Sequence, residues 1–495
     1  MKVKDILNGV DILDIQGDSN RFISDLQYDS RKVEPDQAFI AIKGFQTDGH
    51  RFVSQAYQKG ARVFFCEEKI DLPESTVIYL KSTRQALATL SRNFYRHPDE
   101  KLKIIGITGT NGKTTTAYLI HSILHQAHWK PGLHTTIEYF DGAEWQPTER
   151  TTPESLDLFR LFHRMVQQGL KSVVMEVSSH ALSLSRVEGI RFLAGVFTNL
   201  GRDHLDFHQT QKNYFRAKSH LFEKMDESQR AILNEDDPYG AQLKKMTDAE
   251  IFTFSMKNST ASVSYLSHQH LKEWMVLHLR IPSDEIILRS RLIGSFNIYN
   301  IMASVATAVS LGLNENFLQV GIESLERVPG RCEHYHTPEG YSVYIDYAHT
   351  PDALHHVLQA IWETRPKSLI VVFGAGGDRD RGKRPVMGKV AEDYGDQIIL
   401  TNDNPRSEDP QAIINDILSG ISDKSKVKII PDRREAIYTA LKMASARDSI
   451  VIAGKGHENY QEIKGIKYPL SDRDILKDYF HKKQWIFPEK KEVVA

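Results

Sequence analysis

The stretch GTNGKTT, residues 109–115, has the residue types needed to hold a triphosphate. Glycines let several backbone N–H groups turn toward phosphate oxygens, and a helix that starts at such a loop adds its positive end. Lys113 supplies a cation and Thr114 a hydroxyl for Mg²⁺, so the loop predicts nucleotide binding. The strict pattern G-x-x-x-x-G-K-[ST] is not met because residue 107 is isoleucine, and a merely structural turn is the alternative.

Two more side chains with ligand chemistry follow apolar runs. Glu176 ends the run SVVME, where its carboxylate could hold Mg²⁺ beside a triphosphate. The alternative is an ordinary solvated acid at the end of a strand. His204, in NLGRDHLDFH, offers a nitrogen ligand, although a histidine at such a place is more often structural.

Lys218 lies on the apolar face of a predicted helix. Tyr214 and Phe215 precede it by four and three residues, and Leu221 and Phe222 follow it by three and four. The ammonium therefore points inward, where a charge needs a partner or must be lost. Two outcomes stay open: the side chain reaches a nearby acid, or it is chemically modified into a metal ligand.

Arg406 follows Asp403-Asn404-Pro405 at the end of the apolar run 397–400, just before a predicted helix capped by Asp409 and started by Pro410. Ligands of open α/β sheets bind at this edge, and an anion there would meet a guanidinium fork beside a positive helix end. The alternative is that Arg406 only pairs with Glu408 or Asp409 on the surface.

Composition limits the class of protein. The chain has 495 residues, 40% hydrophobic and 26% charged, which is typical of a globular protein with about three domains. A net charge of −1 argues against general electrostatic binding to nucleic acid or membrane. Two cysteines far apart in the sequence argue against a disulfide scaffold. The first twenty residues carry charges without an apolar core of signal-peptide length, and no run reaches membrane-span length. We therefore expect a cytoplasmic protein without membrane insertion.

Strand-like runs alternate with helical patterns along most of the chain. We expect an α/β protein with three domains: 1–98, a small N-terminal α/β domain, 99–330, a central parallel-sheet domain of phosphate-loop type, and 331–495, a Rossmann-like α/β domain. Residues 250–292 predict antiparallel strands inserted before a helix that starts near Asn297.

Eleven motifs together resemble the Mur ligase family, which builds the peptidoglycan stem peptide. They are GTNGKTT, TTPES, MEVSSHAL, NLGRDHLDFH, YFRAKSHLF, GSFNIYN, GRCE, DYAHTPD, GGDRDRGKRP, DNPR and GKGHE, in the family's order. The pairing of DNPR with GKGHE is most similar to the members that add diaminopimelate as the third amino acid. Arg150 and Leu184 stand where some members have asparagine and glutamine.

The resemblance implies a role for each matching residue. For ATP these are Gly109, Thr110, Asn111, Gly112, Lys113, Thr114 and Thr115, with Asn297, Asn300, Arg331, Asp346 and His349 toward the nucleoside and phosphates. For Mg²⁺, two ions in all, they are Thr114, Glu176, His204 and Lys218, the last as N6-carboxylysine. For the uridine diphosphate they are Tyr28, Ser30 and Phe45-Gln46-Thr47, and for the muramoyl peptide Thr151, Thr152, Ser178 and Arg186. For the incoming amino acid they are Arg379, Asp403, Asn404, Pro405, Arg406, Gly454 and Glu458.

The resemblance also implies the reaction. ATP would phosphorylate the D-glutamate γ-carboxylate of UDP-MurNAc-L-Ala-D-Glu, and the amine of diaminopimelate would then displace phosphate to form an amide in peptidoglycan precursor synthesis, which serves cell wall, cell shape and cell division. The implied catalytic residues are Lys113, Lys218, Glu176 and His204 in a monomeric ligase. Alternatives are the same reaction with L-lysine, a related ligase such as folylpolyglutamate synthase, and a regulator descended from a ligase. If bound lysine left Arg406 unpaired, the enzyme could prefer diaminopimelate over L-lysine by about 10³-fold or more.

Overall fold

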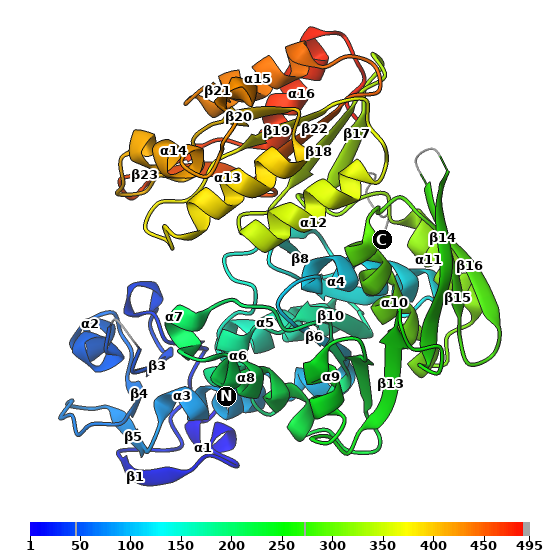
Figure 1. The fold of residues 1–495 in the computed structure, drawn as a ribbon. Coiled ribbons are helices and arrows are strands. Elements are labelled where there is room, and N and C mark those ends of the chain that lie inside the picture. The colour runs from blue at the N-terminus through cyan, green and yellow to red at the C-terminus, as the bar shows by residue number, and fades with distance from the viewer. Residues whose placement is uncertain (45–46, 272–273, 489–495) are drawn as a thin grey trace. The chain divides into compact units, whose positions relative to one another are not determined.

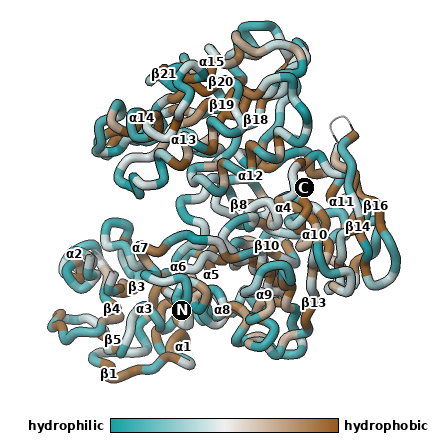
Figure 2. Tube along the Cα trace, viewed as in Figure 1, coloured by the Kyte–Doolittle hydropathy of each residue, from teal (hydrophilic) through white to brown (hydrophobic). Residues whose placement is uncertain are grey.

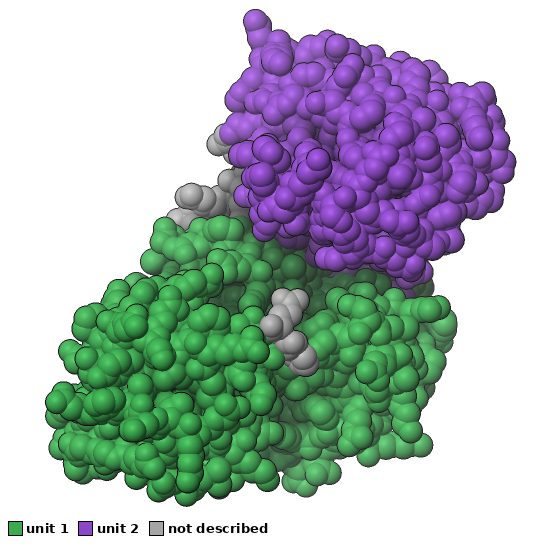
Figure 3. Space-filling model, turned by 90° about the vertical axis from the view of Figure 1, so that its left-hand side faces the viewer, with its two compact units in different colours: residues 1–265, 280–284, 302–321 green, residues 266–279, 285–301, 322–495 purple. Residues whose placement is uncertain are grey.

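The computed structural model describes residues 1–44, 47–271 and 274–488. Phe45 and Gln46, which the resemblance assigns to uridine diphosphate, lie outside these described residues. The chain divides into two compact units, shown in green and purple in Figure 3. Unit 1 contains residues 1–265, 280–284 and 302–321, and unit 2 contains residues 266–279, 285–301 and 322–495.

The first part of unit 1 is a five-stranded sheet with the order β1-β5-β4-β3-β2. Its elements are α1 (Val3–Ile6), β1 (Ile12–Gln16), β2 (Leu26–Gln27), β3 (Ala38–Ile40), α2 (Val53–Gln58), β4 (Val63–Cys66), β5 (Thr76–Leu80) and α3 (Thr83–Phe94). β1 pairs with β5 in antiparallel register, whereas the other neighbouring strands are parallel. The predicted strands QAFIAIKG and ARVFFCEE are β3 and β4, and the pattern QALATLSRNFYR is α3.

The second part of unit 1 is built around parallel strands in the order β13-β12-β11-β6-β10-β7, followed by β8 and β9. Its strands are β6 (Lys103–Thr108), β7 (Pro131–His134), β8 (Glu138–Phe140), β9 (Trp145–Pro147), β10 (Ser172–Glu176), β11 (Phe192–Phe197), β12 (Arg230–Asn234) and β13 (Glu250–Ser255). Its helices are α4 (Lys113–Gln126), α5 (Ser155–Gln167), α6 (Ser179–Ser183), α7 (Leu205–His208), α8 (Gln211–Glu223) and α9 (Pro238–Leu243). β6, β10 and β11 are adjacent and parallel, so their carboxyl ends meet at one edge.

Three further strands follow, namely β14 (Val263–Leu271), β15 (Trp274–Arg280) and β16 (Glu285–Ser290), and they precede helices α10 (Ser295–Ser310) and α11 (Glu315–Ser324). They lie where the sequence predicts inserted strands and a helix near Asn297, but the predicted antiparallel pairing is wrong for β13, which pairs in parallel with β12 and β14. The sheet order continues from β13 through β14 and β15 to β16, and β14 pairs with β13 in parallel.

Unit 2 contains a six-stranded sheet with the order β17-β18-β22-β19-β20-β21. Its strands are β17 (Glu333–His336), β18 (Ser342–Asp346), β19 (Leu369–Phe373), β20 (Gln397–Leu400), β21 (Val427–Ile429) and β22 (Ser449–Ala453). Its helices are α12 (Pro351–Trp362), α13 (Lys383–Tyr394), α14 (Pro410–Leu418), α15 (Arg433–Met443) and α16 (Asp472–Lys482), and β23 (Tyr460–Ile463) and β24 (Ile466–Pro469) form a separate hairpin.

Alternation along the strands explains why this sheet carries helices on both faces. Val371 and Phe373 of β19 belong to the apolar cluster that contains residues of α12, α13 and α14, whereas Ile370 and Val372 belong to the cluster with α15 and α16. Figure 1 shows α12 and α13 on one side of these strands and α15 and α16 on the other. Figure 2 shows the strands as the most hydrophobic part of this layered structure.

The predicted α/β class with several parallel-sheet domains is confirmed. Each of the three ranges 1–98, 99–330 and 331–495 contributes its own sheet, while the boundaries themselves stay a prediction. Across the described residues, no helix combines the length and the apolar composition that crossing a bilayer requires.

Candidate functional site

The phosphate loop joins β6 to α4, as the sequence predicts. Gly109 has φ +149°, and a Cβ built there would lie 1.9 Å from Thr198 Oγ1, so only glycine fits this position. Gly112, at φ 84°, directly precedes the first residue of α4. The ammonium of Lys113 donates to the carbonyl oxygens of Gly109 at 2.9 Å and Thr110 at 2.8 Å. The loop therefore holds its lysine at the start of a helix.

Thr114 and Glu176 meet at the carboxyl edge of the parallel strands. Thr114 Oγ1 donates to Glu176 Oε1 at 2.7 Å, and both side chains are buried. Thr136 adds its backbone N–H to Oε1 at 2.9 Å and its hydroxyl to Oε2 at 3.0 Å. The alternative of a solvated strand-end acid is wrong for Glu176. Hydroxyl and carboxylate oxygens are the hard donors that Mg²⁺ prefers, so this set fits the ion.

Lys218 is 1% exposed on α8, which confirms the predicted inward direction. Its ammonium donates to the carbonyl of Gly109 at 2.7 Å and lies 4.6 Å from the centre of the Tyr214 ring. Of the two outcomes left open by the sequence, the contact with a nearby acid is wrong, because the ammonium donates to a loop carbonyl instead. Burial, reinforced by the charge of Lys113, holds the pKa of Lys218 well below its ordinary value.

His204 stands directly before α7 in a left-handed conformation, with φ 52°. Its Nε2 lies 3.5 Å from Asp203 Oδ2, and its ring centre lies 4.8 Å from that of His180. Burial lowers the pKa of His204, and the charges of Lys113 and Lys218 lower it further although Asp203 opposes them. A neutral imidazole at physiological pH is the form that ligates a metal ion.

The residues predicted to hold the muramoyl peptide are linked by hydrogen bonds to the strand edge that carries Glu176. Thr152 Oγ1 donates to the backbone carbonyl of Glu176 at 2.9 Å and accepts from the N–H of Ser178 at 3.0 Å. Arg186 donates to the carbonyl of Thr152 at 3.1 Å. Thr151 Oγ1 lies 3.0 Å from the hydroxyl oxygen of Thr136. Thr151, Thr152, Ser178 and Arg186 therefore form one connected group.

A buried glutamate, Glu154, forms ion pairs with three arginines beside this group. Its carboxylate lies 2.8 Å from Arg186, 3.0 Å from Arg150 and 3.4 Å from Arg84. One carboxylate facing three guanidinium groups leaves an excess of positive charge, which suits an anionic substrate. Arg150, which departs from some family members, is thus part of an ionic cluster.

Tyr28 and Ser30, predicted to meet uridine diphosphate, lie in the first part of unit 1 with internal partners. The hydroxyl of Tyr28 donates to Asp157 on α5, and that of Ser30 donates to Gln55 Oε1 at 2.7 Å. Burial and the neighbouring carboxylate of Asp157 raise the pKa of Tyr28. Each is therefore a neutral hydroxyl that could donate to a ligand only by exchanging its present acceptor.

The residues predicted for the nucleoside belong to unit 2. Asn297 and Asn300 are buried on α10, where the amide of Asn300 donates to Asn297 Oδ1 at 3.0 Å. Asp346, at the end of β18, accepts from the N–H groups of Cys332 at 2.6 Å and Ala348 at 2.7 Å, and burial raises its pKa to about 6. The guanidinium of Arg331 lies 4.9 Å from the centre of the Tyr347 ring, and His349 Nδ1 is 2.8 Å from the Tyr347 carbonyl.

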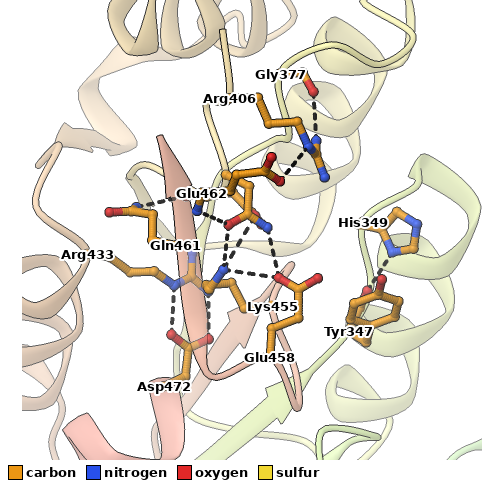
Figure 4. A network of polar contacts seen from close by, with 12 residues as sticks. Tyr347, His349, Gly377, Arg406, Arg433, Lys455, Glu458, Gln461, Glu462 and Asp472 are labelled. Atoms are coloured by element: carbon orange, nitrogen blue, oxygen red, sulfur yellow. Dashed lines mark hydrogen bonds and ion pairs between the residues drawn. The ribbon is translucent and has the colours of Figure 1, made fainter. Parts of the chain in front are cut away.

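Arg406 does not pair with Glu408 or Asp409, so that alternative is wrong. Glu408 faces Arg384 at 2.8 Å, and Asp409 caps α14 by accepting from the N–H of Gln411. Arg406 donates instead through Nη1 to the Gly377 carbonyl at 2.7 Å and through Nε to Glu462 at 3.2 Å (Figure 4). The premise that lysine would leave this guanidinium unpaired is therefore also wrong.

Asn404 is fixed in one orientation by a buried network behind Arg406. Its Oδ1 accepts from the ammonium of Lys455 at 3.0 Å and from the N–H of Glu462 at 2.9 Å, and its Nδ2 donates to Glu458 at 2.8 Å. Lys455 also donates to Glu458 at 3.1 Å and lies 3.9 Å from Asp403. Because the amide oxygen and the amide nitrogen of Asn404 are both hydrogen-bonded, the side chain is held in one orientation.

The other predicted amino-acid contacts surround this network. Gly454 has φ +110°, and a Cβ there would lie 2.4 Å from Asp403 Oδ2, so glycine is required. Pro405 is buried, and a Cβ on Gly377 would lie 1.9 Å from its carbonyl oxygen. Arg379 is exposed, and its guanidinium donates to the Asp378 carbonyl at 3.0 Å.

Among the residues that the sequence did not single out, Thr136, Lys455 and Glu462 also belong to these sites. Lys455 stands inside GKGHE, and it carried a signal because a lysine between glycines directly after an apolar strand must end near a sheet edge. Thr136 and Glu462 lie in segments without an apolar run or a motif, so only the folded chain brings them to the site.

Known protein families match most of this chain. Family models described as the Mur ligase family catalytic domain, the Mur ligase middle domain and the Mur ligase glutamate ligase domain match residues 22–95, 107–308 and 330–456. A protein of Phocaeicola vulgatus named UDP-N-acetylmuramoyl-L-alanyl-D-glutamate--2,6-diaminopimelate ligase is 42% identical over 492 residues, or 97% of this chain and 99% of that protein. The protein of the same name from Aquifex aeolicus is 44% identical over 456 residues, or 92% of this chain and 93% of that protein.

A solved structure carrying the same ligase name is 32% identical with a TM-score of 0.70, and the match covers 98% of this chain and 100% of that chain. The family models match in the order of the motifs, and the relatives align over nearly their whole length. The chain belongs to the Mur ligase family.

Proposed function

We propose that this protein is an ATP-dependent, ADP-forming ligase that adds meso-2,6-diaminopimelate to the D-glutamate γ-carboxylate of UDP-MurNAc-L-Ala-D-Glu. The names of the relatives support the substrates. The observation that carries the proposal for this chain is Arg406, which follows β20 and precedes α14 and is held by hydrogen bonds to the Gly377 carbonyl and to Glu462, with its side chain 20% exposed. Diaminopimelate differs from lysine by one carboxylate, which is the group that a guanidinium fork binds.

Mg²⁺ suits the oxygen donors of unit 1. Thr114 and Glu176 would hold one ion, and His204 with a modified Lys218 would help hold a second. When bound, the ions neutralise charge on the transferring phosphoryl group, a requirement that dominates such reactions. Lys113, at the start of α4, adds a fixed cation for the same phosphates.

Lys218 fits the role of N6-carboxylysine. Carbamylation needs a neutral amine, and its buried, positively surrounded ammonium loses its proton more easily than an ordinary lysine. Carbon dioxide would bond to the nitrogen as the amine gives up a proton, and the carbamate would be an anionic oxygen ligand, which suits Mg²⁺ and removes the cost of a buried cation.

The bond changes follow from the substrates. An oxygen of the γ-carboxylate bonds to the γ-phosphorus of ATP as ADP leaves, which gives an acyl phosphate. The neutral amine of diaminopimelate then bonds to the acyl carbon and phosphate leaves with its bonding electron pair. The amine can attack only when its nitrogen carries a free lone pair, so a base must first accept the proton of the ammonium form.

The setting follows from the reaction. We propose that it takes place in the cytoplasm, in peptidoglycan precursor synthesis for cell wall growth and division, with a monomer as the working form. Neither nucleic acid nor a membrane is needed as a partner, because all three substrates are small soluble molecules. Light scattering during gel filtration checks the monomer, and a mass of two chains would contradict it.

The test is phosphate release by the purified protein with ATP, Mg²⁺, UDP-MurNAc-L-Ala-D-Glu and a panel of diamino acids, with mass spectrometry of the nucleotide product. We expect phosphate only in the complete mixture, in equal amount with the tripeptide product, and fastest with diaminopimelate. Faster reaction with L-lysine would assign the lysine-adding activity instead. Activity with a folate and glutamate but none with the UDP-linked dipeptide would assign folylpolyglutamate synthesis.

A further inference from the structure

The hairpin β23–β24 is a separate two-stranded sheet whose strands are joined by a two-residue turn. Lys464 and Gly465 both have positive φ, 50° and 78°, as the tight hairpin turn with two left-handed residues requires. β24 is exposed along its length, so the hairpin buries little apolar surface. Its shape must therefore come from the contacts that β23 makes with the loop carrying Arg406.

β23 holds this loop through hydrogen bonds from its backbone and its side chains. The N–H of Arg406 donates to the Glu462 carbonyl at 3.0 Å, and the N–H of Lys464 donates back to the Arg406 carbonyl at 2.7 Å. Gln461 adds a hydrogen bond from its amide to the Asp403 carbonyl at 2.7 Å, which Figure 4 shows beside the contacts of Glu462. The hairpin thus fixes the loop before and at the arginine.

This support explains the backbone of Arg406. Its φ is 51°, in the left-handed region that costs a residue with a side chain about 1–2 kcal/mol. Two backbone hydrogen bonds to β23 offset that cost and hold the side chain in one direction.

The side chain of Glu462 then fixes the guanidinium itself. Nε donates to Glu462 Oε2 at 3.2 Å and Nη1 donates to the Gly377 carbonyl at 2.7 Å. A guanidinium has five N–H donors, so these two contacts leave three, on Nη1 and Nη2, for another acceptor. Arg406 and Glu462 are 20% and 26% exposed, so this outer edge is open to a small ligand.

We propose that Glu462 is a specificity-determining positioning residue for the amino-acid substrate: it holds Nε of Arg406 so that the Nη edge meets the substrate's distal carboxylate. It also serves as the internal counter-ion of Arg406 when no diacid is bound. The inference rests on the proposed function and adds to it a residue that acts through Arg406. The alternative is that Arg406 and Glu462 form only a surface ion pair, which would contribute little to stability or to substrate affinity.

Three variants separate these readings in assays of the full-length protein. Glu462→Ala removes the acceptor, Glu462→Asp keeps the charge but shortens its reach, and Glu462→Gln keeps an oxygen acceptor for Nε without the charge. Glu435→Ala, at an exposed position of α15, is the matched control for loss of one negative charge.

We expect Glu462→Ala and Glu462→Asp to raise the KM for diaminopimelate about tenfold or more, with kcat within about threefold of the parent protein. Their KM for ATP and for the UDP-linked dipeptide should not change. Glu462→Gln should restore the KM for diaminopimelate to within about threefold, and Glu435→Ala should match the parent protein.

An unchanged KM for diaminopimelate in Glu462→Ala would overturn the inference, and so would an equal rise in the KM for ATP. Glu462→Gln behaving like Glu462→Ala would overturn the positioning role of the oxygen acceptor. If the unmodified protein turned over no diaminopimelate, the proposed function would fail and this inference with it. Normal turnover by the unmodified protein with insensitive variants would overturn the role of Glu462 alone.

Discussion

At the scale of single residues, the sequence was most informative where a side chain's neighbours along the chain decide its environment. The helical spacing of Tyr214, Phe215, Leu221 and Phe222 is enough to predict a buried Lys218. The alternative in which Arg406 pairs with Glu408 is wrong because Glu408, two residues away, is hydrogen-bonded to Arg384 of α13. Pairing across long sequence separations depends on the completed fold and has no local signal.

Modification of Lys218 is testable apart from activity. Because its amine is biased toward the neutral form, we expect the protein in ¹³C-bicarbonate to give a carbamate signal by ¹³C NMR at neutral pH. Lys218→Ala should lack that signal and, if Lys218 is the proposed metal ligand, lose activity by roughly 100-fold or more. Lys224→Ala, which removes an exposed lysine from the same region, is the control. A signal that persists in Lys218→Ala would place the carbamate elsewhere.

Glu408 should make stability depend on acid pH. The hydrogen bonds from Arg384 lower the pKa of Glu408 from 4.5 to about 2. A carboxyl whose folded-state pKa is depressed stabilises the fold above its ordinary pKa, and that contribution is lost as pH falls from 4.5 toward 2.

The comparison is urea unfolding of the parent protein and Glu408→Gln at several pH values. We expect the parent to be more stable at pH 7 and the difference in unfolding free energy to shrink through that acid window. Glu323→Gln, at an exposed position of α11, should show no such convergence. A difference that stays constant down to the lowest pH would contradict the ionic role of Glu408.

At the scale of elements, buried strands and helix starts could be predicted, and exposed or polar elements could not. β20 and the start of α14 lie at the predicted residues because an apolar run and an Asp-Pro cap are local signals. The hairpin β23–β24 was missed because its strands are only partly buried and show no apolar alternation. Residues 1–27 contain none of the eleven family motifs, yet Val3, Ile6, Ile23 and Leu26 join the core of unit 1.

The phosphate loop depends on the turn between β6 and α4 keeping its shape. Gly109→Ala would drive a Cβ to 1.9 Å from Thr198 Oγ1. We expect nucleotide affinity, measured by calorimetry, to fall about 100-fold and unfolding free energy to fall by about 1–3 kcal/mol.

Gly169→Ala is the matched control for that change. Gly169 also has positive φ, +79°, but nothing lies within 4 Å of a Cβ built there. It should lose some stability from backbone strain and retain nucleotide affinity. Equal affinity losses in the two variants would mean that the close approach to Thr198 is irrelevant.

At the scale of the whole molecule, the chain does not divide into two units at a single point. Residues 302–321 return to unit 1, where Ser122 donates to the Gly321 carbonyl at 2.6 Å. The sequence predicts a domain boundary near residue 330, so residues 302–321 fall before it together with the rest of unit 1. No local pattern in the sequence shows which earlier segment α11 contacts.

We therefore expect a fragment of residues 1–329 to unfold cooperatively and a fragment of residues 1–265 to be poorly folded, since the shorter one exposes the surface of α4 that contacts Gly321. Circular dichroism during heating, with the full chain as reference, makes the comparison. A sharp transition for residues 1–265 at the temperature seen for residues 1–329 would contradict the importance of the returning segment.

The most direct test of substrate choice by Arg406 is the ratio of kcat/KM for diaminopimelate and L-lysine. Because Glu462 and the Gly377 carbonyl keep Arg406 partnered when lysine binds, we expect a cost of about 2–3 kcal/mol, or a ratio of roughly 30- to 150-fold, in place of 10³-fold or more. Arg406→Ala should bring the ratio close to one while nucleotide affinity stays unchanged. Arg434→Ala, which breaks a surface pair with Asp478, should keep the parent ratio. Equal use of the two amino acids by the unmodified protein, or an undiminished preference in Arg406→Ala, would contradict the assignment.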